Sequence, residues 1–281
     1  MKRFGLALVT VMAVIFATQL AWAGEPQPWG ISFQRAASPT MERIASLAGF
    51  INGIILGIML LVSALLAYAC WRFQAARNPK PAKWSHNTML EVAWTSIPAI
   101  ILLLIAVPSF RLLYFMDKVQ DAEMTMKIVG HQWYWTYEYQ DHDFKFDANM
   151  LQDEDLKPGQ PRLLSADNEV VLPAGIPIRL QMTAEDVIHS WAVPAFGVKT
   201  DAIPGRLNES WVQISQPGLY YGQCSQLCGV NHGFMPIQIR AVPKEEFAAW
   251  VASAKTKFTH LDGTKPAIGL ALAAGSKEQQ P

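Results

Sequence analysis

Four side chains with soft donor atoms lie within twelve residues near the end of the chain. Cys224 and Cys228 carry thiols, His232 an imidazole and Met235 a thioether. Thiolate and thioether sulfur favour copper over hard cations, and imidazole suits copper as well. The stretch therefore predicts a copper centre suited to electron transfer. A further ligand must come from elsewhere, and His189 is the best candidate.

The two cysteines alone are a weak signal. In an oxidising compartment, such a pair is a disulfide or a zinc site about as often as a copper site, and His189 alone would more often be a core histidine. The combination with His232 and Met235 in a β domain shifts the balance to copper. Four residues apart in one loop, both thiolates can bridge two metal ions, with the backbone carbonyl of Gln226 between them pointing inward. The third cysteine, Cys70, lies in an apolar run and is interpreted as inert.

A β domain is expected to position these ligands. From about residue 124 the chain consists of short alternating segments, such as the one with Ile176, Ile178, Leu180 and Met182, separated by Gly, Pro, Asn and Asp. This pattern predicts an all-β sandwich or barrel. A turn at 217–218 leads a strand into Cys224, so the ligands lie on a loop between two strands. Residues 244–254 predict a short helix, and residues 257–281 a flexible tail.

The N-terminal half predicts a membrane anchor. Residues 1–23 combine two basic residues, an apolar run and a small-x-small end, as in a signal peptide cut after Ala23; an uncleaved membrane helix is the alternative. Residues 24–46 form a segment outside the membrane. The uncharged runs 47–71 and 92–110 are long enough to cross a bilayer, so residues 47–118 form a two-helix hairpin.

Charge gives the orientation of the hairpin. Four basic residues between the helices, Arg72, Arg77, Lys80 and Lys83, place this loop in the cytoplasm. The β domain then faces the periplasm, which suits a bacterial inner membrane. A net charge of +0 argues against a general nucleic-acid binder. Glu91 stands at the cytoplasmic edge of the second helix; its residue type alone favours a solvated flank slightly over a functional carboxylate.

A second group of residues combines aromatic and acidic side chains. Residues 130–139 carry aromatic side chains on both faces of a predicted strand, and acidic side chains follow. An exposed aromatic ring surrounded by acids is typical of a docking surface for a basic protein. The alternative is a solvated acidic edge strand.

Together these motifs resemble subunit II of the haem-copper cytochrome c oxidases. C-S-x-L-C-G-x-N-H-x-F-M, G-H-Q-W-Y-W-x-Y-E-Y, D-V-I-H-S-W-A-V-P and K-T-D-A-I-P-G-R occur in the family's order, and the match runs from the first membrane helix to about Trp250. The resemblance implies a cupredoxin-like Greek-key domain at 119–256 that carries a dinuclear copper centre, CuA. The implied ligands are His189, Cys224, the Gln226 carbonyl oxygen, Cys228, His232 and Met235.

The resemblance also implies roles for other residues. Electrons from cytochrome c would enter through Trp133 and pass from the copper pair to haem a in subunit I, where oxygen is reduced and protons are pumped; subunit III is a further partner. Glu91 would lie at the mouth of a proton channel, which reverses the interpretation from residue type alone. The implied docking acids are Glu138, Asp141, Asp143, Asp147 and Asp186. The enzymatic activity belongs to the complex, because this chain has no oxygen site of its own.

One position departs from the family pattern. Gln226 stands where the family usually has a glutamate whose carboxylate binds magnesium, and a neutral amide is a weaker ligand for a hard cation, so magnesium binding is left open. Three other functions compete. A quinol oxidase subunit should lack the two thiols, and a membrane-tethered copper carrier needs neither Glu91 nor Trp133. A disulfide-stapled periplasmic domain leaves His189, His232 and Met235 unexplained.

Overall fold

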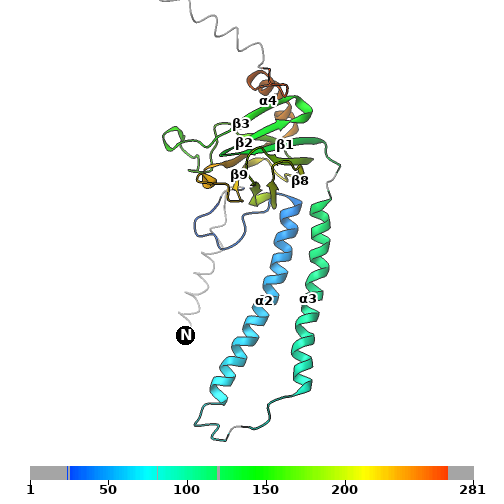
Figure 1. Cartoon of the computed structure of the whole chain (residues 1–281), viewed down its shortest axis with the longest axis vertical. Coiled ribbons are helices and arrows are strands. Elements are labelled where there is room, and N and C mark those ends of the chain that lie inside the picture. Colours follow the sequence, from blue (N-terminus) through cyan, green and yellow to red (C-terminus); the bar gives the residue numbers. More distant parts are fainter. Residues whose placement is uncertain (1–23, 25, 81, 119–120, 265–281) are drawn as a thin grey trace, which may run out of the picture. The chain divides into compact units, whose positions relative to one another are not determined.

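The computed structural model of the chain describes residues 24, 26–80, 82–118 and 121–264 (Figure 1). The predicted signal peptide at 1–23 and most of the predicted tail, residues 265–281, lie outside the described residues. Two compact units are present. One comprises Arg43–Asp117, and the other comprises the chain on either side of it.

Two long helices make up the first unit. Helix α2 spans Pro39–Arg72 and helix α3 spans Thr88–Asp117, and both are long and apolar enough to cross a membrane. Helix α2 begins eight residues before the uncharged run, because Ser38 accepts a hydrogen bond from the Met41 backbone at 3.0 Å and caps the helix. Helix α3 contains Pro98 and Pro108. The predicted two-helix membrane anchor is confirmed.

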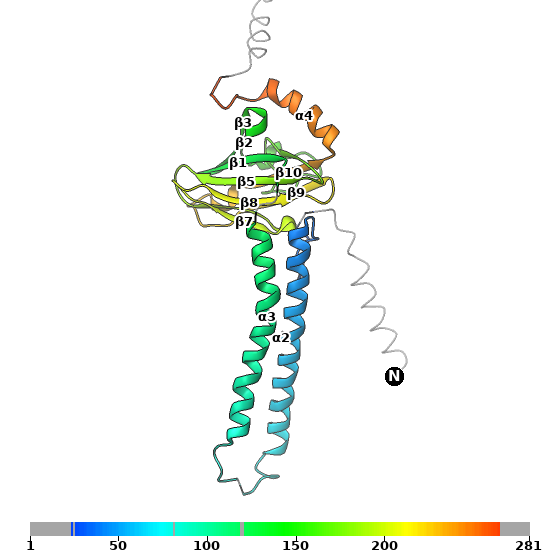
Figure 2. The ribbon, with the colours of Figure 1, turned by 90° about the vertical axis from the view of Figure 1, so that its right-hand side faces the viewer.

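The second unit is a sandwich of two five-stranded sheets (Figure 2). The strand order is β3-β2-β1-β5-β8 in one sheet and β4-β10-β9-β6-β7 in the other. Among the strands of the described residues, the pairs β1–β5 and β4–β10 run parallel and the other pairs are antiparallel. The strand bounds are β1 Met124–His131, β2 Tyr134–Tyr139, β3 Phe144–Ala148, β4 Val170–Pro173, β5 Pro177–Ala184, β6 His189–Val193, β7 Val198–Ala202, β8 Asn208–Gln213, β9 Gly218–Cys224 and β10 Pro236–Val242.

Alternation of apolar and polar residues explains the strands. In β5, Ile178, Leu180 and Met182 are fully buried and the residues between them are partly exposed, because successive side chains of a strand point to opposite faces. Helix α4 (Lys244–Lys257) covers one edge with Phe247 and Val251, as the sequence predicts. Short 3-10 helices occupy Gln140–His142 (η1), Asp153–Asp155 (η2), Pro194–Phe196 (η3) and His232–Phe234 (η4). The predicted β sandwich is confirmed.

Candidate metal centre

The side chains of Cys224 and Cys228 lie close together and are buried, at the end of β9 and in the loop that follows it. Their sulfur atoms are 3.9 Å apart, whereas a disulfide requires about 2.05 Å. Both cysteines are free thiols. Metal–sulfur bonds of about 2.3 Å in a tetrahedral site separate two such ligands by roughly 3.8 Å. The spacing therefore fits two sulfur ligands of one metal centre.

His189 reaches the thiols because strand β6 pairs with β9. Trp191 faces Cys224 in this register, and the Ser225 N–H donates to the Ser190 carbonyl at 2.9 Å. The Nδ1 atom of His189 then lies 3.9 Å from the Cys224 sulfur. The ligand atoms of His189, Cys224 and Cys228 all lie within 4.8 Å of one another.

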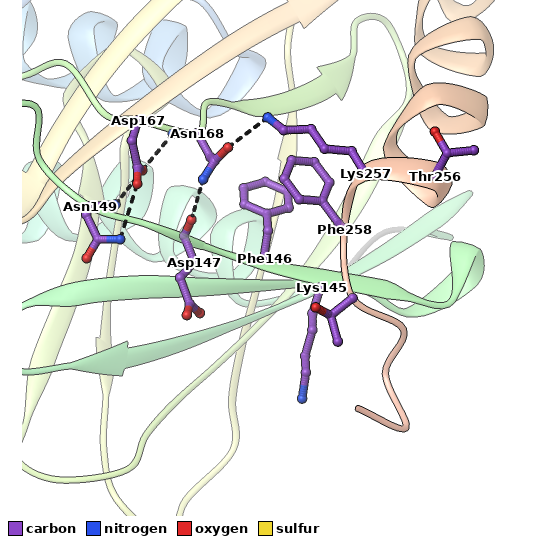
Figure 3. Close-up of a pocket in the computed structure, with 10 residues that line it drawn as sticks. Lys145, Phe146, Asp147, Asn149, Asp167, Asn168, Thr256, Lys257 and Phe258 are labelled. Atoms are coloured by element: carbon purple, nitrogen blue, oxygen red, sulfur yellow. Dashed lines mark hydrogen bonds between the residues drawn. The ribbon is translucent and has the colours of Figure 1, made fainter. Parts of the chain in front are cut away.

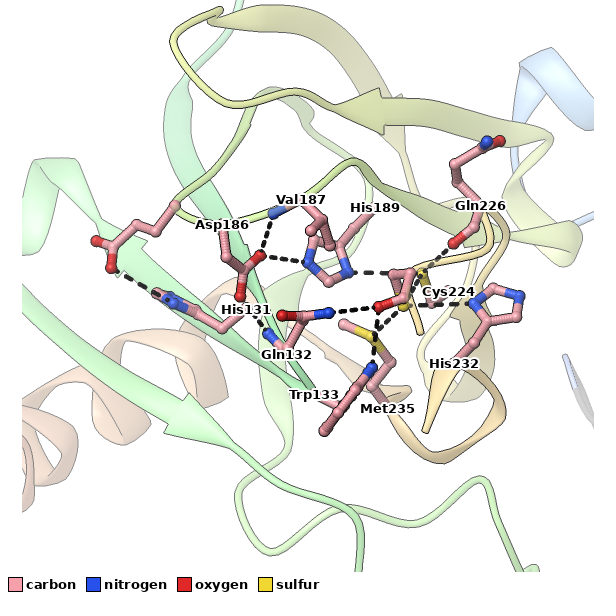
Figure 4. A network of polar contacts seen from close by, with 12 residues as sticks. His131, Gln132, Trp133, Asp186, Val187, His189, Cys224, Gln226, His232 and Met235 are labelled. Carbon is pink, nitrogen blue, oxygen red and sulfur yellow. Dashed lines mark hydrogen bonds and ion pairs between the residues drawn. The ribbon is translucent and has the colours of Figure 1, made fainter. Parts of the chain in front are cut away.

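The rest of the loop places the other predicted ligands on the same cluster (Figure 4). The His232 Nδ1 atom lies 3.5 Å from the Cys228 sulfur, and the Met235 sulfur lies 3.7 Å from it. The carbonyl oxygen of Gln226 lies 3.4 Å from the Cys224 sulfur. All six predicted ligand groups thus come together, and the donor set of sulfur and imidazole fits copper.

The two thiols differ in acidity. Burial raises the pKa of Cys224, but hydrogen bonds with His189, with the backbone of Gln226 and Ser190 and with His232 together outweigh this effect and lower the pKa to about 6. Burial, together with the charge of the neighbouring Cys224, raises the pKa of Cys228 to about 12. The pair therefore carries one negative charge near neutral pH. A bound cation favours the second thiolate, because it offsets the repulsion between two adjacent negative sulfur atoms.

Asp186 fixes the orientation of His189. Asp186 Oδ1 lies 2.8 Å from His189 Nε2, within hydrogen-bond distance. Nε2 can therefore donate to the carboxylate while the Nδ1 lone pair faces the thiols, as is usual for metal-binding histidines. Asp186 also accepts the backbone N–H groups of Gln132 at 2.6 Å and Val187 at 2.6 Å. Sequence reasoning had assigned Asp186 only to docking.

The turn between β1 and β2 is tied to the ligand loop. The carbonyl oxygen of Cys228 accepts hydrogen bonds from Gln132 Nε2 at 2.8 Å and from Trp133 Nε1 at 3.1 Å. Gly229, next to this carbonyl, has φ 119°, and a Cβ atom there would lie 3.0 Å from the Trp133 ring. Trp133 thus contacts the loop directly. The sequence patterns assigned no role to Gln132, although this residue directly precedes Trp133 in the G-H-Q-W-Y-W motif.

The predicted docking acids do not form one ring around Trp133. Strands β2 and β3 are antiparallel, and Asp147 faces Thr136, near the Trp133 end of the pair. Glu138 faces Lys145 at the opposite end and pairs with Lys127 at 3.1 Å. Asp141 and Asp143 lie beyond that end, where β2 meets β3.

Three carboxylates lie near the Tyr134 ring, next to Trp133, and two of them are among the predicted docking acids. The pKa of the adjacent Tyr134 phenol is raised by burial and by the charges of three carboxylates, Asp147, Glu185 and Asp186. The Glu185 side chain is 73% exposed and lies 3.5 Å from His131 Nδ1. Sequence reasoning missed Glu185, although it directly precedes Asp186.

Glu91 lies in the first turn of α3, away from the cluster in sequence and in a different unit. Its Oε1 atom accepts the backbone N–H of Asn87 at 3.3 Å. The carboxylate thus helps to cap the helix, and its predicted proton-channel role stays a prediction. The Gln226 side chain is exposed.

A cavity of about 470 Å³ lies between β3 and the end of α4 (Figure 3). Its polar groups bond to each other: Lys257 Nζ donates to Asn168 at 3.0 Å, and the Asn149 N–H donates to Asp167 at 2.7 Å. The cavity contains no thiol or histidine. It is a hydrogen-bonded hollow separate from the ligand cluster.

Comparison with known proteins gives a consistent assignment for both units. Residues 26–112 match the transmembrane domain of cytochrome c oxidase subunit II, and residues 124–242 match the periplasmic domain of the same subunit. The chain is 51% identical over 247 residues to the probable cytochrome c oxidase subunit 2 of Rickettsia bellii, covering 88% of this chain and 92% of that protein. It is 47% identical to cytochrome c oxidase subunit 2 of Arabidopsis thaliana, covering 81% and 90% respectively.

A solved structure is also similar to part of the chain. It is the periplasmic domain of subunit II of cytochrome oxidase from Bradyrhizobium japonicum, with 55% sequence identity. The structural alignment covers 50% of this chain and 100% of the Bradyrhizobium japonicum chain, with a TM-score of 0.48.

Proposed function

The chain belongs to the cytochrome c oxidase subunit II family, and on that premise we propose that it is the electron-input subunit of a proton-pumping oxidase. As a member of this copper-binding family, the chain is a membrane subunit of an oxidase and assembles with other oxidase subunits. The finer proposal is that it accepts electrons from cytochrome c at a dinuclear CuA centre and passes them to haem a in subunit I. The observation that carries it is the convergence of two imidazoles, a thioether and a backbone carbonyl oxygen on two unbridged thiols 3.9 Å apart.

The proposed ligands are His189, Cys224, the Gln226 carbonyl oxygen, Cys228, His232 and Met235. Two copper ions held by these groups supply one-electron transfer with little change in ligand geometry. The surrounding protein keeps the ligands in place: Asp186 orients His189, and the burial of both thiols excludes water from the sulfur atoms. The side-chain amide of Gln226 is neutral, so magnesium binding at this position is not part of the proposal.

Trp133 is the proposed residue through which electrons enter. Its ring lies partly exposed at the β1–β2 turn, and its N–H donates to the carbonyl of the proposed ligand Cys228. One hydrogen bond and the Cys228 backbone therefore connect the surface ring to a ligand. Nearby carboxylates, including Asp147 and Asp186, favour a basic partner such as cytochrome c.

The proposal includes the topology of the chain. Residues 1–23 are a signal peptide, the loop between α2 and α3 is cytoplasmic, and the β domain is periplasmic at a bacterial inner membrane. The basic residues of that loop support this orientation. Glu91, at the cytoplasmic end of α3, is the proposed entrance of a proton channel completed by subunit I. Subunit III completes the proposed set of partners.

The test is an electron paramagnetic resonance spectrum, with copper quantitation, of the purified full chain reconstituted with copper. Two coppers per chain that share one unpaired electron are expected. Cys228→Ser should abolish this signal, while Cys70→Ser is the matched control, because Cys70 is exposed on α2 and outside the cluster. One localised copper per chain, or a Cys224–Cys228 disulfide without metal, would contradict the proposal.

A further inference from the structure

A second candidate binding site lies between the membrane helices. A groove of about 420 Å³ is lined by residues spaced three or four apart on one face of each helix, as expected for two facing helical surfaces. On α2 these are Arg43, Ser46, Leu47 and Phe50, and on α3 they are Pro108, Arg111 and Leu112. This volume falls within the range of about 300–1,000 Å³ that is typical of ligand sites.

The groove is polar at one end and apolar at the other. Arg111 directly follows the uncharged run of α3, and Arg43 precedes that of α2 by four residues, or about 6 Å along a helix. Because α2 and α3 form a hairpin, both arginines lie at the same boundary between apolar and polar sequence. Leu47 and Phe50 of α2 and Pro108 of α3 line the apolar part of the groove, and Leu112 lies beside Arg111.

Neither guanidinium group of the groove has an ion-pair partner within the described part of the chain. Neither Arg43 nor Arg111 forms an ion pair or a side-chain hydrogen bond there. Arg43 lies over the Phe115 ring at 3.6 Å from its centre, a cation–π contact that uses none of its five N–H donors. Two like charges on one groove repel each other, and an anion between them relieves that repulsion.

We propose that this groove binds an anionic phospholipid. The phosphate lies between Arg43 and Arg111, whose forked donors match phosphate oxygens, and the Ser46 hydroxyl can donate to the same group. An acyl chain follows the apolar wall formed by Leu47, Phe50 and Pro108. Lone arginines at helix ends usually extend into the headgroup region. Here, two arginines line one groove that continues between apolar side chains. An amphipathic lipid can occupy both parts of the groove, whereas free phosphate can occupy only the part beside the arginines.

The test is native mass spectrometry of the purified full chain in detergent, titrated with phosphatidylglycerol or with phosphatidylcholine of the same acyl chains. Phosphatidylglycerol should bind about tenfold more tightly, and Arg43→Gln or Arg111→Gln should each remove about that factor, the size expected for a charged hydrogen bond. Arg72→Gln is the matched control: it lies at the other end of α2, also beside a phenylalanine ring, and should bind like the wild type. Phe50→Ala should weaken both lipids alike.

Four results would overturn the inference. Equal binding of the two lipids would remove the role of the arginines, and an equal loss in Arg72→Gln would show that binding depends only on total charge. Displacement of the lipid by millimolar inorganic phosphate would indicate a simple anion site. Absence of the lipid from the assembled oxidase, when the isolated chain retains it, would show that another subunit covers the groove.

Discussion

The position of the acidic residues makes a sharp prediction about docking. Asp147→Asn should slow the association of reduced cytochrome c with the oxidase, whereas Asp141→Asn should leave it almost unchanged. Both carboxylates accept one hydrogen bond, from Thr136 Oγ1 at 2.6 Å and from the Thr125 N–H at 2.7 Å. Because asparagine retains an acceptor oxygen, the two variants differ mainly in where they remove a charge.

The expected magnitude follows from distance. Asp147 faces Thr136, three residues from Trp133, while Asp141 lies beyond Tyr139, about 20 Å of strand away from Trp133. A partner cation that contacts the Trp133 region at about 5 Å from Asp147 gains about 0.5 kcal/mol at 0.1 M salt, after screening over a Debye length of about 10 Å. The same cation at about 20 Å from Asp141 gains less than about 0.05 kcal/mol.

These energies correspond to a two- to threefold slower association for Asp147→Asn, against about 1.1-fold or less for Asp141→Asn. The assay is stopped-flow mixing of reduced cytochrome c with the purified oxidase that carries each variant, repeated at several ionic strengths. The difference should grow at about 0.01 M salt and nearly vanish at about 1 M. An equal effect of the two variants, or a difference that does not change with salt, would refute the docking position proposed around Trp133.

Two further predictions concern the folded domain. Gly130→Ala would place a Cβ atom 2.8 Å from the buried His189 ring. The variant should therefore destabilise the domain by about 1–3 kcal/mol and reduce the copper bound per chain. In the control Gly233→Ala, the added Cβ atom meets nothing within 4 Å, so thermal unfolding and copper content should match the wild type. Burial and then the charge of Lys255 lower the pKa of His142, so the unfolded chain binds the proton more readily and stability should fall as pH drops below about 6.5. His142→Gln should flatten this dependence in denaturant unfolding at pH 5.5 and 7.5, and an unchanged slope would contradict the assignment.

Local patterns account for the parts of the fold that sequence predicts well. The period of two in β5 follows from burial of one face, as Ile178 and Leu180 show, and the membrane helices follow from long uncharged runs. The uncharged run predicts a later start for α2 than the structure shows, because that run marks the apolar span and not the whole helix. The capping contact between Ser38 and Met41 sets the boundary instead.

The ligand loop was also predictable, because its chemistry is concentrated in consecutive residues. The residues that hold this loop in place could not be predicted, because their contacts with it join distant parts of the chain. Gln132 and Cys228 are 96 residues apart, and Gln132 and Asp186 are 54 apart. The docking acids show the same limit: Glu138 follows Trp133 closely in sequence, but strand β2 carries it away, while the hairpin returns Asp147 to the Trp133 end.

The same distant contacts explain how the proposed centre can be held rigidly. The β1–β2 turn and β2 belong to one sheet, whereas β6, β9 and β10 belong to the other. Gln132 and Trp133 donate to the Cys228 carbonyl, and Trp135 Nε1 donates to the Met235 carbonyl at 3.3 Å. Every one of these bonds crosses between the sheets at the ligand loop.

Asp186 closes the arrangement, because its carboxylate contacts both His189 and the backbone of Gln132. Movement of His189 or Cys228 therefore disturbs the turn that carries Trp133. Electron transfer favours such a site, since ligands that stay in place need little rearrangement when the charge on the metal changes. The position of the loop at the junction of two sheets is thus as much a part of the proposed mechanism as the sulfur atoms are.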